Sequence, residues 1–187
     1  MHNIDWSAAL EAIAADIITV ASHQPTERLP QEEQVRTALA SWFRATGAHA
    51  VHVEAGCHDA NDPGRPPECD LRVVLADGHE IWVEVKGGTG DVPGYLSKPA
   101  ENLYGWLHDV EKLRTAPDSV TRALVVVGLR QRGHAGKLFS TRQLEQVTQA
   151  IARSVEVPDV GFIKREIPFD AWRDITPAEV VAHAWVW

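Results

Sequence analysis

Three residues that could do chemistry lie close together near the middle of the chain. Asp70 begins one apolar run, and Glu84 and Lys86 lie two residues apart in the next. Two carboxylates can hold a hard divalent cation such as Mg²⁺ or Mn²⁺ through oxygen ligands. The metal can activate a water for attack on a phosphoryl group, and a lysine beside that water can orient it or neutralise the developing charge. These residues therefore indicate phosphodiester hydrolysis, provided that the fold brings them together.

The two apolar runs predict a β-hairpin. Residues 70–76 are rich in Val and Leu, and Asp77-Gly78 is a strong turn signal because both residues tolerate positive φ. In residues 80–86, apolar side chains alternate with Glu84 and Lys86. Both charges therefore leave the strand on the face opposite to its apolar side chains.

The register of this hairpin decides where Asp70 points. A three-residue turn over 77–79 would pair Ala76 with Glu80 and place Asp70 opposite Lys86, on the face that carries the other two charges. A two-residue turn would move Asp70 to the apolar face, where a carboxylate without partners is costly. We therefore expect an odd-numbered loop or a bulge.

Asp70, followed after a hairpin by Glu84-Val85-Lys86, resembles the PD-(D/E)XK nuclease superfamily, which includes restriction enzymes, Holliday-junction resolvases and phage exonucleases. The resemblance implies that Asp70 and Glu84 bind Mg²⁺ or Mn²⁺, that Val85 adds its backbone carbonyl, and that Lys86 serves the attacking water. The first motif departs from the family pattern, since Cys69 stands where the family has proline.

Glu32 is the fourth candidate for this site. It lies in line with the apolar stripe of the helix predicted over 31–46, whereas Glu33 lies more to the side. The superfamily often carries a glutamate on its first core helix that points at the metal, so the resemblance implies this role for Glu32, with Glu33 as the second candidate. The alternative is an ordinary acidic first turn, which the helix dipole favours.

Candidate nucleic-acid contacts follow the most apolar run of the chain, residues 120–129, which we expect to form a central strand. The basic residues of the loop after it could bind phosphates, although a solvated loop is the plainer explanation. The resemblance adds a polar residue near the start of the helix predicted over 98–115. The candidates are Arg130, Arg132, His134 and Lys137 in the loop, and Lys98 or Asn102 at the helix.

The order of predicted elements indicates an α/β fold in one domain, residues 1–187. Residues 31–130 read helix, three strands, helix, strand, which is similar to the αβββαβ restriction-endonuclease-like core, a mixed central sheet flanked by helices. An N-terminal helix over 4–22 precedes this core. An extension over 138–187 follows it and contains a helix over 141–154, a possible strand over 160–167 and a final helix from 176 to the C-terminus.

Composition bounds the class of protein. Hydrophobic content of 44% and charged content of 24% in 187 residues are ordinary for a globular protein. A net charge of −8 argues against a protein that coats DNA, but carboxylates around a metal site would add to that charge. Two cysteines fit a reducing compartment, and no stretch reaches transmembrane length. We expect a cytoplasmic protein without a membrane partner.

These patterns favour a metal-dependent nuclease that hydrolyses DNA rather than RNA, with endonuclease and exonuclease action both open. The resemblance adds an expected homodimer, and a partner chain could supply targeting. One alternative is a catalytically inactive nuclease fold that binds or regulates within a larger assembly. Another is an unrelated α/β interaction protein, in which Asp70, Glu84 and Lys86 do not converge.

Overall fold

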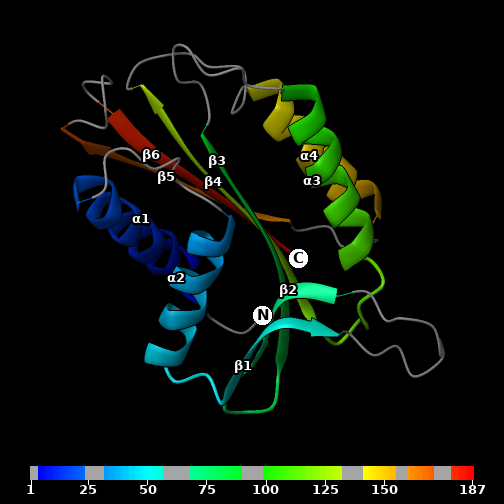
Figure 1. Ribbon diagram of the computed structural model, residues 1–187. Coiled ribbons are helices and arrows are strands. Elements are labelled where there is room, and N and C mark those ends of the chain that lie inside the picture. Colours follow the sequence, from blue (N-terminus) through cyan, green and yellow to red (C-terminus); the bar gives the residue numbers. More distant parts are fainter. Residues whose placement is uncertain are drawn as a thin grey trace.

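A mixed β-sheet lies between two layers of helices in the computed structural model of the chain (Figure 1). The structure describes residues 4–23, 32–56, 68–89, 99–131, 141–154, 160–170 and 178–187. Helices α1 (Trp6–His23) and α2 (Glu32–Ala45) cover one face of the sheet, and α3 (Pro99–Leu113) and α4 (Thr141–Ser154) cover the other. The fold is therefore α/β, as predicted.

The strands lie in the order β1-β2-β3-β4-β6-β5. Strands β3 and β4 are parallel, and every other neighbouring pair is antiparallel. The parallel pair is joined through α3, which fits the need of parallel strands for a crossover connection. The strands are β1 (Ala50–Gly56), β2 (Glu68–Val74), β3 (Glu80–Thr89), β4 (Thr121–Gln131), β5 (Gly161–Phe169) and β6 (Ala178–Val186).

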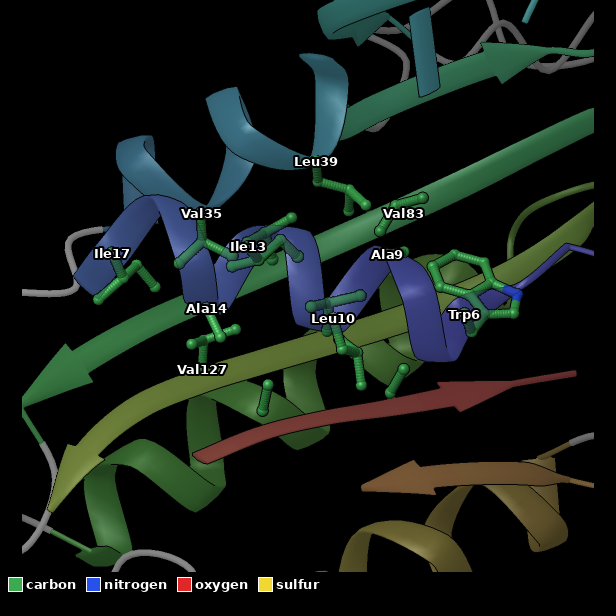
Figure 2. Close-up of a cluster of buried hydrophobic side chains, with 14 of the residues drawn as sticks. Trp6, Ala9, Leu10, Ile13, Ala14, Ile17, Val35, Leu39, Val83 and Val127 are labelled. Carbon is green, nitrogen blue, oxygen red and sulfur yellow. The ribbon is translucent and has the colours of Figure 1, made fainter. Parts of the chain in front are cut away.

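Helices α1 and α2 pack against the sheet through apolar stripes (Figure 2). The stripe of α1 recurs at helical spacing, and the Oδ1 atom of Asp5 caps the helix by accepting a hydrogen bond from the Ala8 N–H at 3.0 Å. The predicted helices over 4–22 and 31–46 are confirmed. The fully buried residues of this layer include Leu10, Ile13, Val35, Leu39, Val83 and Val127.

The opposite layer contains most of the tryptophans in its core. Trp82, Trp185 and Trp187 of the sheet region pack with Trp106 of α3, and Val147 of α4 joins them. The predicted helices over 98–115 and 141–154 are confirmed, as is the strand over 120–129, which is buried on both faces. Among the described residues no helix is both long and apolar enough to cross a membrane.

Arg122 of β4 anchors the end of α3. Its guanidinium is buried and donates hydrogen bonds to the carbonyl oxygens of Leu113 at 3.0 Å and Ala116 at 2.6 Å. Leu113 is the last residue of α3, and its carbonyl also accepts from the Ala116 N–H at 3.1 Å. Arg122 therefore adds a second donor at the helix end, where carbonyls lack partners within the helix, and also binds the Ala116 carbonyl of the following turn. This contact fixes α3 against the sheet.

The prediction of a C-terminal helix from residue 176 is wrong, because residues 178–186 form β6 between β4 and β5. The Thr176-Pro177 pair is typical of a helix start, but the residues after it are apolar except for Glu179 and His183 and include the β-branched Val180 and Val181. Pairing with two strands buries both faces at once. The predicted extension over 138–187 thus supplies α4, β5 and a strand inside the sheet.

We expect Trp185→Ala to lower the free energy of unfolding by about 3–5 kcal/mol. The Trp185 side chain is fully buried, and its Nε1 donates to Thr148 Oγ1 at 2.9 Å. Urea denaturation followed by circular dichroism measures the change. Tyr104→Ala is the control, since that side chain is 76% exposed and should change stability little. Equal losses in the two variants would contradict a central position for β6.

Candidate active site

The turn between β2 and β3 has an odd-numbered loop, as predicted, but it begins one residue earlier than expected. The Leu75 N–H donates to the His79 carbonyl at 2.8 Å, and the Gly78 N–H donates to the Leu75 carbonyl at 3.0 Å. Gly78 has φ of +85°, so it takes the left-handed position at the end of a three-residue loop. The expected loop over 77–79 would have put Gly78 in the middle. Because Gly78 takes the last position, the loop covers residues 76–78 instead.

This turn sets a register in which Val74 pairs with Glu80. The prediction that Ala76 pairs with Glu80 is therefore wrong by two residues, and Asp70 lies across from Glu84 instead of Lys86. A shift of two residues leaves the face of every side chain unchanged. The Asp70 carboxylate lies close enough to Glu84 and Lys86 to raise the pKa of each.

Strand β2 leaves β3 at Asp70. The paired residues of the two strands end at Leu71 and Val83, although β3 remains paired with β4 as far as Thr89. The next backbone donor on this edge of β3, the Val85 N–H, donates to the Asp70 Oδ2 at 2.8 Å. Because the N–H and C=O of a strand residue point to the same edge, the Val85 carbonyl also lies on the edge of β3 from which β2 has separated.

A bend in β1 and β2 accompanies this departure. Glu54, across from Asp70, has φ of +51°, a conformation that is uncommon outside glycine. Cys69 and Leu71 pack on opposite faces of the sheet, although residues two apart in a straight strand share a face. Arg36 of α2 lies at the bend, 2.8 Å from Glu54 Oε1 and 3.7 Å from Asp70 Oδ1.

Lys86 lies between two helices from opposite layers. Its Nζ is 3.3 Å from Glu32 Oε2 of α2 and 3.2 Å from Asp109 Oδ2 of α3. Burial acts to lower the pKa of Lys86, but the carboxylates of Asp109, Glu32 and Asp70 raise it above its ordinary value. Lys86 is therefore a cation at neutral pH.

Glu84 is the most buried charge of the cluster, with 1% of its side chain exposed. Burial and the negative charges of Asp70 and Asp109 raise its pKa to about 8, against the opposing effect of Lys112, whose Nζ lies 2.6 Å from Glu84 Oε1. Burial acts to lower the pKa of Lys112, but the hydrogen bond to Glu84 and the nearby acids raise it.

Asp109 is a member of the site that sequence reasoning missed. Its side chain is buried, and burial raises its pKa in opposition to Lys86. The signal was present in the sequence, because Asp109 lies within the stripe formed by Trp106, Val110 and Leu113. An acid inside a buried stripe needs a partner. Lys112 follows Asp109 by about one turn of α3 and is a second member of the site that the sequence did not predict.

The fold thus brings Asp70, Glu84 and Lys86 together and adds Glu32, while Glu33 is exposed. If the chain were an unrelated interaction protein, these three residues would not be expected to converge. The side chains of the remaining candidate residues are not among those that the structure describes. Asn102 belongs to α3 and Arg130 to β4, where the structure describes only the backbone, and Lys98, Arg132, His134 and Lys137 lie outside the described residues.

The donors beside the bend suit a hard cation. Asp70 and Glu84 offer carboxylate oxygens and Val85 a carbonyl oxygen, and Mg²⁺ commonly takes one or two protein carboxylates and completes its shell with water and substrate phosphate. Within the described ranges, no group of three or more His, Cys, Asp or Glu side chains could hold a metal ion. Any metal here would therefore depend on the carbonyl, water and substrate as further ligands.

Comparison with protein-family models, with curated proteins and with solved structures found no match to this chain in any of the three. Assignment of function therefore depends on the residues and their geometry.

In metal-free buffer, we expect the wild-type protein to lose stability as the pH rises from 4.5 to about 8. The folded protein holds a proton on Glu84 in this range that the unfolded chain has released, so the free energy of unfolding falls by up to about 1.4 kcal/mol per pH unit. Glu84→Gln should remove this contribution.

Urea denaturation at a series of pH values measures both proteins. The control is Glu111→Gln, the same chemical change at an exposed position of α3, which should follow the wild type. Parallel pH profiles for wild type and Glu84→Gln would show that the pKa of Glu84 is not raised.

Proposed function

We propose that this protein is a metal-dependent nuclease of the PD-(D/E)XK type, which hydrolyses phosphodiester bonds of DNA rather than RNA. The observation that carries the proposal is the separation of the strands at Asp70, where β2 leaves β3 and the Asp70 carboxylate accepts a hydrogen bond from the Val85 N–H at 2.8 Å. Glu84 and Lys86 flank Val85 on the same rigid strand.

The arrangement of elements supports the same proposal. Helix α2, the antiparallel strands β1, β2 and β3, helix α3 and the parallel strand β4 follow one another along the chain. They place one helix on each face of the sheet (Figure 1). We take this to be the restriction-endonuclease-like core, with α1 before it and α4, β5 and β6 after it.

Asp70, Glu84 and the Val85 carbonyl are the proposed metal ligands. When bound there, Mg²⁺ or Mn²⁺ would activate a water and stabilise the charge on the leaving oxygen. Since ligands must be deprotonated and the pKa of Glu84 is raised to about 8, Glu84 releases a proton when it becomes a ligand at neutral pH. Because the Glu84 side chain is buried and its strand is paired inside the sheet, its carboxylate is held in one place.

Lys86 acts as a cation and not as a base. The acids around it raise its pKa, so at neutral pH it cannot accept a proton from water. Its ammonium can instead orient the water and neutralise charge that develops on the phosphoryl group. Glu32 and Asp109 hold it from opposite layers, which limits where the ammonium can move.

A second candidate is an inactive nuclease fold that binds or regulates. The observation in its favour is that Lys112 pairs with Glu84 and Asp109 pairs with Lys86, so each charged residue of the β3 motif has a partner of opposite charge without any metal. The two proposals differ in metal binding at Asp70 and Glu84.

We expect wild-type protein to bind Mn²⁺ and to cleave supercoiled plasmid, and Glu84→Gln to lose both properties because it loses a carboxylate ligand. Calorimetric titration measures the binding, and gel electrophoresis measures the cleavage. Glu111→Gln should retain both, since its side chain is 62% exposed and pairs with Arg114. Metal binding without cleavage would favour the inactive fold, and no metal binding by the wild type would exclude the proposed chemistry.

We expect Asp109→Asn to lower kcat about 10- to 100-fold, the usual effect of removing a residue that orients a group of the site. Loss of its charge also lowers the pKa of Lys86, so the alkaline limit of the pH–rate profile should move to lower pH. Asp109→Glu should restore part of the rate. An unchanged alkaline limit in Asp109→Asn would show that Asp109 does not act through Lys86.

A further inference from the structure

Helix α3 carries a counter-charge for each charged residue of the β3 motif. Lys112 Nζ lies 2.6 Å from Glu84 Oε1, and Asp109 Oδ2 lies 3.2 Å from Lys86 Nζ. Residues three apart on a helix lie on one side of it, so both pairs form across the same α3–β3 contact. Their two β3 partners are a proposed ligand of the metal and the proposed catalytic cation.

The Lys112 ammonium lies against the Glu84 carboxylate, which is one of the proposed metal ligands. It contacts a Glu84 oxygen directly, and the negative charges of Asp70 and Asp109 also act on it. The field that attracts Lys112 is therefore the field that would attract a divalent cation.

Lys112 is the partner of this pair that can move. Its side chain is 27% exposed and ends a flexible four-carbon stem, whereas that of Glu84 is 1% exposed and belongs to a strand paired inside the sheet. A cation that arrives at Glu84 can displace Lys112 toward solvent but cannot draw Glu84 away from the sheet.

We propose that Lys112 competes with the metal for Glu84. In the metal-free protein the Lys112 ammonium pairs with the Glu84 carboxylate; when the metal displaces it, the ammonium binds a phosphate oxygen of the nucleic acid. This inference depends on the proposed metal site. With Glu84 ionised, the carboxylates of Glu32, Asp70, Glu84 and Asp109 outnumber the ammonium groups of Lys86 and Lys112 by two. A divalent cation cancels this excess of negative charge, so that a phosphodiester anion is no longer repelled from the displaced ammonium.

Metal and nucleic acid must then bind cooperatively. The phosphate gives Lys112 a partner away from Glu84 and so removes the competitor of the metal. By linkage, the bound metal strengthens phosphate binding by the same factor.

Calorimetric titration of Mn²⁺ into wild type, Lys112→Met and Arg114→Met tests the competition. Lys112→Met should bind Mn²⁺ at least about tenfold more tightly than wild type, an effect within the usual range of coupling between sites. Arg114→Met is the matched control, since it removes one positive charge from the same end of α3 at an exposed side chain whose partner is Glu111. It should match wild type.

The outcomes separate this inference from the proposed function. If wild type binds Mn²⁺ and Lys112→Met binds it equally or more weakly, the competition is wrong and the metal site stands. If none of the three proteins binds Mn²⁺, the competition and the proposed metal site fail together.

A repeat of the titration with a DNA duplex carrying hydrolysis-resistant phosphorothioate linkages tests the phosphate step. The duplex should tighten Mn²⁺ binding several-fold in wild type and much less in Lys112→Met. No gain in wild type, or the same gain in both proteins, would overturn this step.

A measurement on the wild type alone covers the case in which Lys112→Met does not fold. Brief acetylation followed by mass spectrometry reports how accessible each lysine is. The reactivity of Lys112 should rise as Mn²⁺ is added, and that of Lys164, which pairs with Glu166 on β5, should stay constant. Constant reactivity of Lys112 under saturating Mn²⁺ would overturn the displacement.

Discussion

The hydrogen bond from the Val85 N–H to the Asp70 carboxylate is the contact on which the rest of the site depends. A buried backbone donor must find a partner, so β2 can leave β3 only where something replaces it. Asp70 supplies the replacement from its side chain. Beyond this point α2 and α3 reach the edge of β3 from opposite layers, through their contacts with Lys86 and Glu84. One side chain thus ends the strand pairing and contributes an acid to the opening.

Charges at this opening hold the layers together at some cost in stability. Removing charges from water is expensive, and pairing repays it only partly. The raised pKa of Glu84 is a sign of that cost, because its ionised form is disfavoured where it lies. Structural needs alone would be met by an apolar residue at this position, two residues after Trp82, which packs in the tryptophan-rich layer. The cost is easier to explain if the carboxylate has a function.

Local patterns predicted the parts of the structure that depend on local chemistry. Alternation in residues 80–86 identified β3 and the face of its charges, and Asp77-Gly78 identified the turn. The register required knowing which loop position Gly78 takes, and the sequence permitted more than one answer. At β6 the Thr176-Pro177 signal was locally sound but was overridden by pairing with β4 and β5, which depends on residues far away in the chain.

The site shows the same division. Glu84 and Lys86 could be found because they share a strand, and Glu32 because it lies in line with the stripe of its helix. Asp109 and Lys112 become part of the site only when α3 packs against β3, and Arg122 fixes that packing from β4. A residue that acts through a contact between layers leaves a weaker trace in the sequence, in this case an acid within an apolar stripe.

The acidic character of the chain bears on how it could approach a nucleic acid. A net charge of −8 repels a polyanion over distances comparable to the Debye length. The site adds to this repulsion while its carboxylates outnumber its ammonium groups. Under the proposed function, a bound divalent cation would cancel the excess of carboxylates over ammonium groups among Glu32, Asp70, Glu84, Lys86, Asp109 and Lys112 and so remove this local repulsion. On this argument the metal would serve recognition as well as chemistry, because a phosphate would approach most readily when the metal is already bound.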